Sequence, residues 1–313
     1  MKAMRVLVTA LFGLSLSAAA QAQDYPTRPV TLVVPFSAGG TSDVIARVVA
    51  ERMQQPLGQR IVIENVGGAG GSTALTRVAR SAADGYTLAI GNIGTNAASY
   101  VLYPEIKYTP DSFAPVGLAA KTVGVLAIRK DFPAKNLADF VAYAKANPGK
   151  VSLGHAGVGS SNFLICKAFL AAAKVDVTLV SYRGAAPALT DLIGQQIDGV
   201  CDGAASVTGA ILGGEVRGIA VPVPERLKSL PDVPTATEAG LPEVSAQGWN
   251  AFFVPAGTPD AVIEKLNAAL RSAIADPTLQ KRLGELGAGA ASAEEATPEF
   301  VRKTVAADIE RFK

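Results

Sequence analysis

Residues 33–43 read VVPFSAGGTSD and contain the turn that decides the fold. An apolar strand ends there, two glycines follow, and hydroxyl and acidic residues then open a helix. Apolar residues recur from Ile45 to Met53 at the i, i+3, i+4, i+8 spacing of an amphipathic helix. The stretch therefore predicts a strand that turns tightly into a helix.

This turn has the features of an anion site. Gly39 and Gly40 permit positive φ and close backbone approach, and free amides at a helix N-terminus favour negative charge. On the residues alone, the turn is either such a site or an ordinary turn whose helix is capped by Asp43. Because a carboxylate facing an anionic ligand would repel it, we expect Asp43 either to stay at the helix end or to meet a ligand ammonium group.

The same pattern recurs at residues 151–161, which read VSLGHAGVGSS and lead into a helix with apolar Phe169 and Leu170. Strand-like runs alternate with helical patterns along the whole chain, which indicates an α/β protein with mostly parallel sheets. The predicted strands are 31–35, 61–64, 87–91, 114–118, 123–129, 151–154, 178–181, 199–202, 218–221 and 251–254.

The repeated pattern predicts two doubly wound α/β lobes. Ligands of open α/β sheets bind outside the carboxyl ends of the strands, so two such lobes that face each other define a cleft. We expect residues 24–122 together with 249–313 to form one lobe and residues 123–248 to form the other. The two crossings, near Thr122 and Trp249, would then act as hinges.

Two further loops follow predicted strands at the same cleft. Residues 91–96 offer Thr95 and Asn96, and residues 201–206 offer Asp202 and Ser206. Each loop is either part of the site or a common structural turn. Two helix ends supply roughly 1 to 4 kcal/mol, whereas micromolar binding needs about 8. Further hydrogen bonds and apolar contact are therefore required, and Phe36 is the candidate for the apolar contact.

Composition and the N-terminal residues predict an exported globular protein. The chain has 313 residues, of which 49% are hydrophobic and 18% are charged, enough for one large or two mid-sized domains. Residues 1–23 begin with Lys2 and Arg5, continue through an apolar run and end in small residues, the pattern of a secretory signal peptide. We expect cleavage near Ala22 and a periplasmic location.

The sequence shows no constellation for nucleic-acid binding or for catalysis. A formal net charge of +2 provides no basic patch, so we expect no nucleic-acid partner. His155 is the only histidine, and no nucleophile-elbow motif occurs, so we predict no catalytic residue, metal site or cofactor. The residues alone therefore indicate no catalytic activity.

Cys166 and Cys201 are the only cysteines. An exported chain could join them in one disulfide. Both also lie in apolar patterns, Cys166 on a helical face and Cys201 at the end of a strand, where they could be two buried thiols. Sequence leaves both alternatives open.

Several stretches resemble the extracytoplasmic solute receptors of tripartite tricarboxylate transporters, also called Bug receptors. The resemblance runs in unbroken order from Asp24 to Lys313. Its stretches are 25–30 (YPTRPV), 33–43, 65–71 (NVGGAGG), 83–88 (ADGYTL), 182–189 (YRGAAPAL), 230–235 (LPDVPT), 238–242 (EAGLP) and 255–259 (PAGTP).

The resemblance implies a type II periplasmic-binding-protein fold that closes on a small organic carboxylate and delivers it to integral membrane permease subunits. The ligand would be a di- or tricarboxylate, an amino acid or an aromatic acid, and we expect the receptor to be a monomer. Together with the residue patterns, the resemblance predicts ligand contacts from Phe36, Ser37, Ala38, Gly39, Gly40, Asp43, Thr95, Asn96, His155, Ala156, Gly157, Ser160, Ser161 and Asp202.

The chain departs from the family pattern where specificity would be set. Asn162 or Phe163 stands about where histidine is usual, and Asn96 replaces another common histidine. Ligand identity therefore stays open. Two alternative functions also stay open: a secreted α/β hydrolase-like enzyme, and a carboxylate sensor that acts in signalling.

Overall fold

The computed structural model describes residues 25–313, and the predicted signal peptide lies outside them. The strands are β1 (Val30–Val34), β2 (Ile61–Asn65), β3 (Thr87–Asn92), β4 (Phe113–Arg129), β5 (Ser152–His155), β6 (Thr178–Ser181), β7 (Gly199–Gly203), β8 (Val216–Ala220), β9 (Gln247–Pro255) and β10 (Gly289–Ala290). The helices are α2 (Thr41–Leu57), α3 (Ser72–Ala79), α4 (Ser99–Leu102), α5 (Leu137–Ala146), α6 (Ser161–Ala173), α7 (Ala185–Ile193), α8 (Ala204–Leu212), α9 (Asp260–Ala275), α10 (Pro277–Glu285) and α11 (Pro298–Phe312). Three short helical turns are η1 (Ala69–Gly71), η2 (Gly94–Ala98), which is a π-helix, and η3 (Pro110–Ser112).

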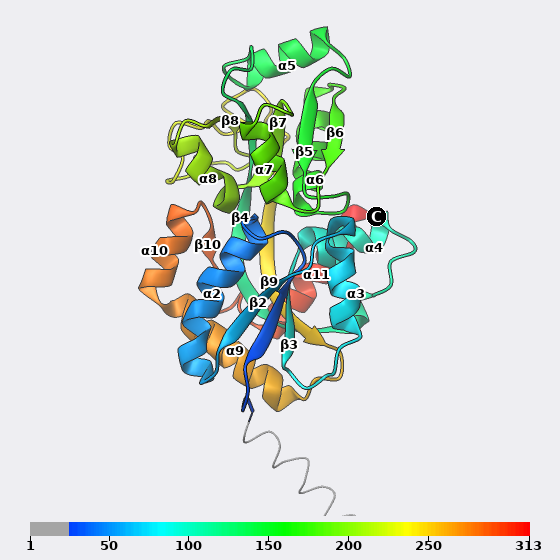
Figure 1. Ribbon diagram of the computed structural model, residues 1–313, viewed down its shortest axis with the longest axis vertical. Coiled ribbons are helices and arrows are strands. Elements are labelled where there is room, and N and C mark those ends of the chain that lie inside the picture. The colour runs from blue at the N-terminus through cyan, green and yellow to red at the C-terminus, as the bar shows by residue number, and fades with distance from the viewer. Residues whose placement is uncertain (1–24) are drawn as a thin grey trace, which may run out of the picture.

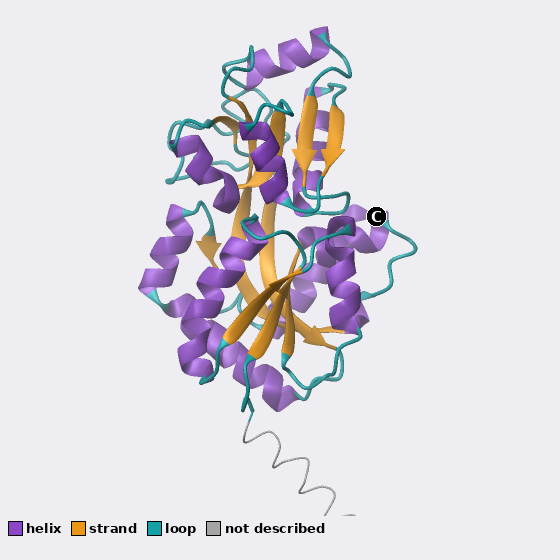
Figure 2. Cartoon of the chain, viewed as in Figure 1, coloured by secondary structure: helices purple, strands orange, loops and turns teal. Residues whose placement is uncertain are grey.

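The chain forms two lobes that meet at a waist (Figure 1). The first lobe contains β1, β2 and β3 with α2, α3 and α9, and the second contains β5 to β8 with α5 to α8. The strands β5 and β6 run with their carboxyl ends toward the first lobe (Figure 2). The turns that follow these strands are therefore directed at the waist.

Pairing in the sheet is parallel at its two flanks and antiparallel at its centre. The strand order is β2-β1-β3-β9-β4-β7-β5-β6. In the first lobe β1 pairs parallel with β2 and β3, and in the second β5 pairs parallel with β6 and β7. The expectation of mostly parallel sheets is wrong at the centre, because β4 pairs antiparallel with β7, β8, β9 and β10, and β9 pairs antiparallel with β3.

The long strand β4 corrects two of the predicted strands. Residues 114–118 and 123–129 belong to one strand of 17 residues that runs from the first lobe into the second. Lys121 and Thr122, which lie between the two predicted strands, continue β4 and pair with Trp249 and Gly248 of β9. Two register shifts in this pairing bend the ladder without ending it. The two-residue strand β10 was not predicted.

Both faces of the second-lobe sheet are buried. Along β4, Leu126 and Ile128 belong to one apolar cluster, while Val125 and Ala127 belong to another. This alternation follows from the period of two in a strand, which sends successive side chains to opposite faces. Helices therefore cover the sheet on both sides, as a doubly wound lobe requires.

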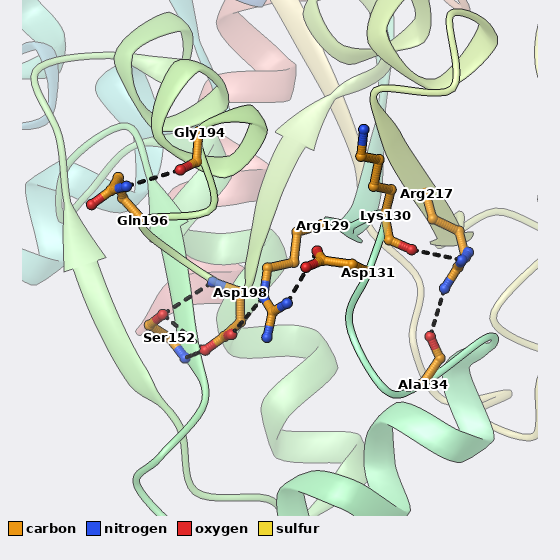
Figure 3. A network of polar contacts seen from close by, with 9 residues as sticks. All are labelled: Arg129, Lys130, Asp131, Ala134, Ser152, Gly194, Gln196, Asp198 and Arg217. Atoms are coloured by element: carbon orange, nitrogen blue, oxygen red, sulfur yellow. Dashed lines mark hydrogen bonds and ion pairs between the residues drawn. The ribbon is translucent and has the colours of Figure 1, made fainter.

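A polar network ties together strand ends in the second lobe (Figure 3). Asp198, just before β7, accepts from Arg129 Nε at 3.1 Å and from Ser152 N at 2.9 Å. Arg217 of β8 donates to the carbonyls of Lys130 and Ala134, each at 2.8 Å. These contacts join β4, β5, β7 and β8 at one edge of the lobe.

A disulfide joins Cys166 of α6 to Cys201 of β7, with 5.3 Å between their Cα atoms. This outcome decides between the two alternatives that the sequence left open. The bond fixes α6 against the strand whose end carries Asp202. Among residues 25–313, no helix is long and apolar enough to span a membrane.

Candidate functional site

A cavity of about 330 Å³ lies between the lobes, and residues of both lobes line it. Small-molecule pockets in proteins span about 300 to 1,000 Å³, so this one suits a small ligand. The first lobe contributes Phe36 and the start of α2, and the second contributes Ala156 and the start of α6. The crossing strands β4 and β9 contribute Thr122 and Gly248.

Four helix N-termini converge on this cavity. Its wall includes Gly40, Thr41 and Ser42 at α2, Ser161 and Asn162 at α6, Ala185 at α7, and Gly203 before α8. The N-caps of α2, α7 and α8 are glycines, which have no side chain with which to bond the first amides of the helix. First-turn amides have no partner within the helix, and they carry the positive end of its dipole. The wall can therefore hold an anionic group.

Apolar side chains complete the cavity. Ile93, Val123, Leu164 and Ile165 line it, and Phe36 packs with Ala156 and Ala185 in a small buried cluster that joins the lobes. Helix-end amides beside an apolar wall suit a ligand with a negatively charged end and a hydrocarbon or aromatic body.

Asp43 is buried in the first turn of α2, and protein donors occupy both of its oxygens. Its Oδ2 accepts from Gly39 N and from Arg47 Nε, each at 2.9 Å, and its Oδ1 accepts from Asn65 Nδ2 at 2.8 Å. Burial alone would raise the pKa of this carboxyl, but hydrogen bonds from Arg47, the Gly39 amide and Asn65 hold it below its usual range. Asp43 thus shapes the glycine turn, and the N-cap position belongs to Gly40.

His155 and Ser160 are buried in the second turn, and both bond the backbone of Gly157. Gly157 N donates to His155 Nδ1 at 3.2 Å, and Ser160 Oγ donates to Gly157 O at 2.6 Å. Ser160 Oγ also accepts from Phe163 N at 3.2 Å and so caps α6. Burial lowers the pKa of His155, which keeps the ring neutral. These side chains hold the turn in shape.

Asp202 is buried at the end of β7. Its Oδ1 accepts from Gly203 N at 2.7 Å and from Asn162 Nδ2 at 2.8 Å. Burial is the largest cause that raises the pKa of this carboxyl, and the hydrogen bonds offset it only in part. The group connects the starts of α6 and α8 behind the cavity wall.

Thr95 and Asn96 lie in the π-helix η2 and are buried. Thr95 Oγ1 donates to Asn96 Oδ1 at 2.8 Å and accepts from Asn92 N at 3.0 Å. Their polar atoms thus bond each other and the end of β3.

The two lobes touch each other around the cavity. A Cβ added to Gly70 of the first lobe would collide with Val158 O of the second. Thr41 Oγ1 at the start of α2 donates to Ser206 Oγ of α8 at 3.3 Å. The backbones meet so closely that the lobes are closed on the cavity.

The structure places the predicted ligand-binding residues in two layers. Phe36, Gly40, Ala156 and Ser161 line the cavity. The others form the loops around or behind the wall, and they are Ser37, Ala38, Gly39, Asp43, Thr95, Asn96, His155, Gly157, Ser160 and Asp202. Whether any of them contacts a ligand stays a prediction.

Sequence reasoning missed several residues of the cavity wall. Ser42 Oγ accepts from Asn250 Nδ2 at 3.0 Å, and both residues line the cavity. Asn250 directly precedes the predicted strand at 251–254, so extending that strand by one residue would have placed it beside the cleft. Arg311 and Phe312 also line the cavity, although no local pattern near the C-terminus points to it.

The fold, the interlobe cavity and the converging helix ends define a two-lobed periplasmic binding protein. Residues 45–308 match the model of the tripartite tricarboxylate transporter family receptor. A UPF0065 protein of Agrobacterium vitis is 41% identical over 295 residues, covering 94% of this chain and 85% of that protein. BugT of Bordetella pertussis is 32% identical over 299 residues, covering 95% of this chain and 91% of BugT. The chain belongs to the tripartite tricarboxylate transporter receptor family.

Solved structures agree with this assignment. The periplasmic binding protein BugD superposes with a TM-score of 0.89 at 38% identity, covering 92% of this chain and 96% of BugD. MatC of Rhodopseudomonas palustris, with bound malate, superposes with a TM-score of 0.88 at 40% identity, covering 92% of this chain and 98% of MatC. An R. palustris protein with adipate reaches 0.88 at 34% identity, covering 92% and 96%. The predicted family and the two-lobed α/β fold are confirmed.

Proposed function

We propose that this protein is an extracytoplasmic receptor that captures a small organic carboxylate in the cavity between its lobes. The convergence of four helix N-termini on one cavity carries the proposal, because it gathers amide donors and positive dipole ends around a single point. The malate and adipate in two related structures support the same class of ligand.

We further propose that the receptor acts in the periplasm and delivers its ligand to a membrane permease, without catalysing a reaction. Membership of the receptor family supports this role. The bonds of His155 and Ser160 also support it, because each side chain bonds the backbone of Gly157 and, among the described residues, no hydrogen bond joins the serine to the histidine. The lobe boundaries that we propose are residues 122 and 249, where β4 and β9 cross the waist.

A thermal-shift screen tests the proposal. Purified protein, unfolded and refolded to remove bound ligand, is mixed with mono-, di- and tricarboxylates, acidic amino acids and aromatic acids. A ligand at about 100 times its Kd adds about 2.7 kcal/mol to the free energy of unfolding. We expect at least one acid to raise the melting temperature, and a complete lack of response would refute carboxylate capture.

Gly40→Val tests whether the α2 turn belongs to the binding site. The isopropyl group of valine would stand in the cavity wall among the α2 amides. Gly209→Val is the matched control, since a Cβ added to Gly209 meets nothing within 4 Å. We expect Gly40→Val to abolish the shift and Gly209→Val to keep it. Normal binding by folded Gly40→Val would show that the α2 turn is not part of the site.

A further inference from the structure

The last turn of α11 stands at the entrance of the cavity. Three of the residues that line the cavity are exposed, Ser245, Gln247 and Arg311, and they mark its opening. Figure 1 shows the C-terminus at the junction of the lobes, next to α4. A segment remote in sequence from the glycine turns therefore borders the same cavity.

Arg311 is the one ionisable residue among those that line the cavity within the described chain. The other lining residues are apolar, hydroxyl-bearing, amide-bearing or glycine. A guanidinium carries five N–H donors in a planar fork that matches a carboxylate. The cavity thus combines the amides of helix ends with one guanidinium at its opening.

Neighbouring groups hold this guanidinium in place. Arg311 Nη2 lies 3.0 Å from Asp308 Oδ1, while Asp308 Oδ2 accepts from Trp249 Nε1 at 2.8 Å. The Arg311 guanidinium also lies over the ring of Phe312, 5.0 Å from its centroid. The ion pair with Asp308 cancels much of the electrostatic attraction that Arg311 would exert at long range. The guanidinium can therefore select a ligand only through direct contact. Further N–H donors remain beyond the one that Asp308 accepts.

We propose that Arg311 is a specificity-determining residue that binds a second anionic group of the ligand, so that the receptor favours dicarboxylates over monocarboxylates of the same length. This inference rests on the proposed function, in which the helix ends hold the first carboxylate. The alternative is that Arg311 only forms an ion pair one helical turn from Asp308 and treats both classes of acid alike.

Isothermal titration with two matched pairs of acids, adipate with hexanoate and succinate with butyrate, tests the inference. The Arg311 side chain is 60% exposed, so solvent weakens its attraction to a ligand carboxylate. We expect Arg311→Gln to weaken binding of the dicarboxylate about fivefold and to leave the monocarboxylate within about twofold. Arg311→Lys should restore part of the preference.

Arg302→Gln removes the same charge from the exposed face of the same helix, outside the cavity wall, and is the control. An equal loss in Arg302→Gln and Arg311→Gln would assign the effect to net charge and overturn the inference. An unchanged ratio of dicarboxylate to monocarboxylate affinity in Arg311→Gln would also overturn it while leaving carboxylate capture intact. Failure of the wild-type protein to bind any of the four acids would overturn the inference, whereas only failure of the whole thermal-shift screen would refute carboxylate capture.

Discussion

Asn162 and Asp202 join the starts of α6 and α8 through one hydrogen bond, in which Asn162 Nδ2 donates to Asp202 Oδ1 at 2.8 Å. The same amide lies 3.1 Å from Cys201 O, and the disulfide from Cys201 enters α6 one helical turn further along. Asn162 lines the cavity, whereas Asp202 lies behind it. A polar bond and a covalent bond therefore hold the same helix against the same strand.

Asn162→Ala should lower the free energy of unfolding by about 1 to 3 kcal/mol, because it leaves a buried carboxylate with one donor fewer. It should also raise the pKa of Asp202 further, since the Asn162 bond lowers that pKa. Urea denaturation measures the stability. Asn147→Ala, which loses a bond to Tyr143 O at the end of α5, is the control and should cost less than about 1 kcal/mol. A loss no larger than in this control would refute the role of Asn162.

Removal of the disulfide in the double variant Cys166→Ala and Cys201→Ala should cost about 3 to 4 kcal/mol. The bond closes a loop with a sequence separation of 35. Without it, the unfolded chain gains conformational entropy, which lowers the free energy of unfolding. Urea denaturation of the variant, and of wild-type protein with and without reductant, measures it. A difference below about 1 kcal/mol would mean that α6 and β7 hold together without the bond.

The contribution of His155 to the stability of the protein should fall as pH is lowered from 7 to 5. Burial lowers the pKa of His155, so the unfolded chain takes up a proton below about pH 6.5 that the folded chain resists. The contribution is present above that pH and is lost as pH falls, with a slope of at most about 1.4 kcal/mol per pH unit. Urea melts at several pH values measure the slope.

The difference between wild type and a His155 variant isolates the histidine, because the chain has only one and because the opposing contribution of buried Asp202, whose pKa is raised, is common to both proteins. His155→Asn removes the titrating ring and is the comparison. The difference in unfolding free energy between wild type and variant should shrink or reverse toward pH 5. A constant difference from pH 7 to 5 would show that burial does not shift this group.

Gly70→Ala should prevent the lobes from closing on a ligand. The new Cβ would collide with the backbone carbonyl of Val158 in the opposite lobe, and neither backbone can move aside cheaply. We expect ligand affinity to drop at least tenfold and small-angle scattering to show a larger radius of gyration in the presence of ligand than for wild type.

Gly149→Ala is the matched control for this variant. Gly149 has φ +71 and Gly70 has φ +62, so both substitutions carry the same backbone strain, about 1 to 2 kcal/mol. A Cβ on Gly149 meets nothing within 4 Å. Equal affinities for the two variants would mean that the contact between Gly70 and Val158 has no part in closure.

Local patterns predicted the framework of the site but not its assembly. The turns at residues 33–43 and 151–161 were recognisable because glycine, hydroxyl residues and helical periodicity are short-range signals. The pairing of Ser42 with Asn250 spans 208 residues, and no local pattern encodes it. The place of Arg311 at the cavity opening depends in the same way on how α11 packs.

The continuity of β4 was hidden for a related reason. The predicted strands 114–118 and 123–129 leave out residues 119–122, yet Lys121 and Thr122 pair with β9 and remain in a strand. The hydrogen-bond partners of Asp43 also could not be predicted from local sequence, since its partner Asn65 lies at the end of β2, 22 residues away. Sequence indicated that Asp43 belongs to the helix end, whereas only the structure shows which donors surround it.

The single tryptophan of the chain lies where the two lobes cross, and it gives the protein a built-in optical probe. Trp249 is buried in β9 next to Gly248, and its indole N–H bonds the carboxylate that also positions Arg311. Indole emission responds to local polarity and to nearby charge. Opening, closing and occupation of the cavity entrance should therefore change the intrinsic fluorescence of the unlabelled receptor, so its binding kinetics can be followed in a stopped-flow instrument.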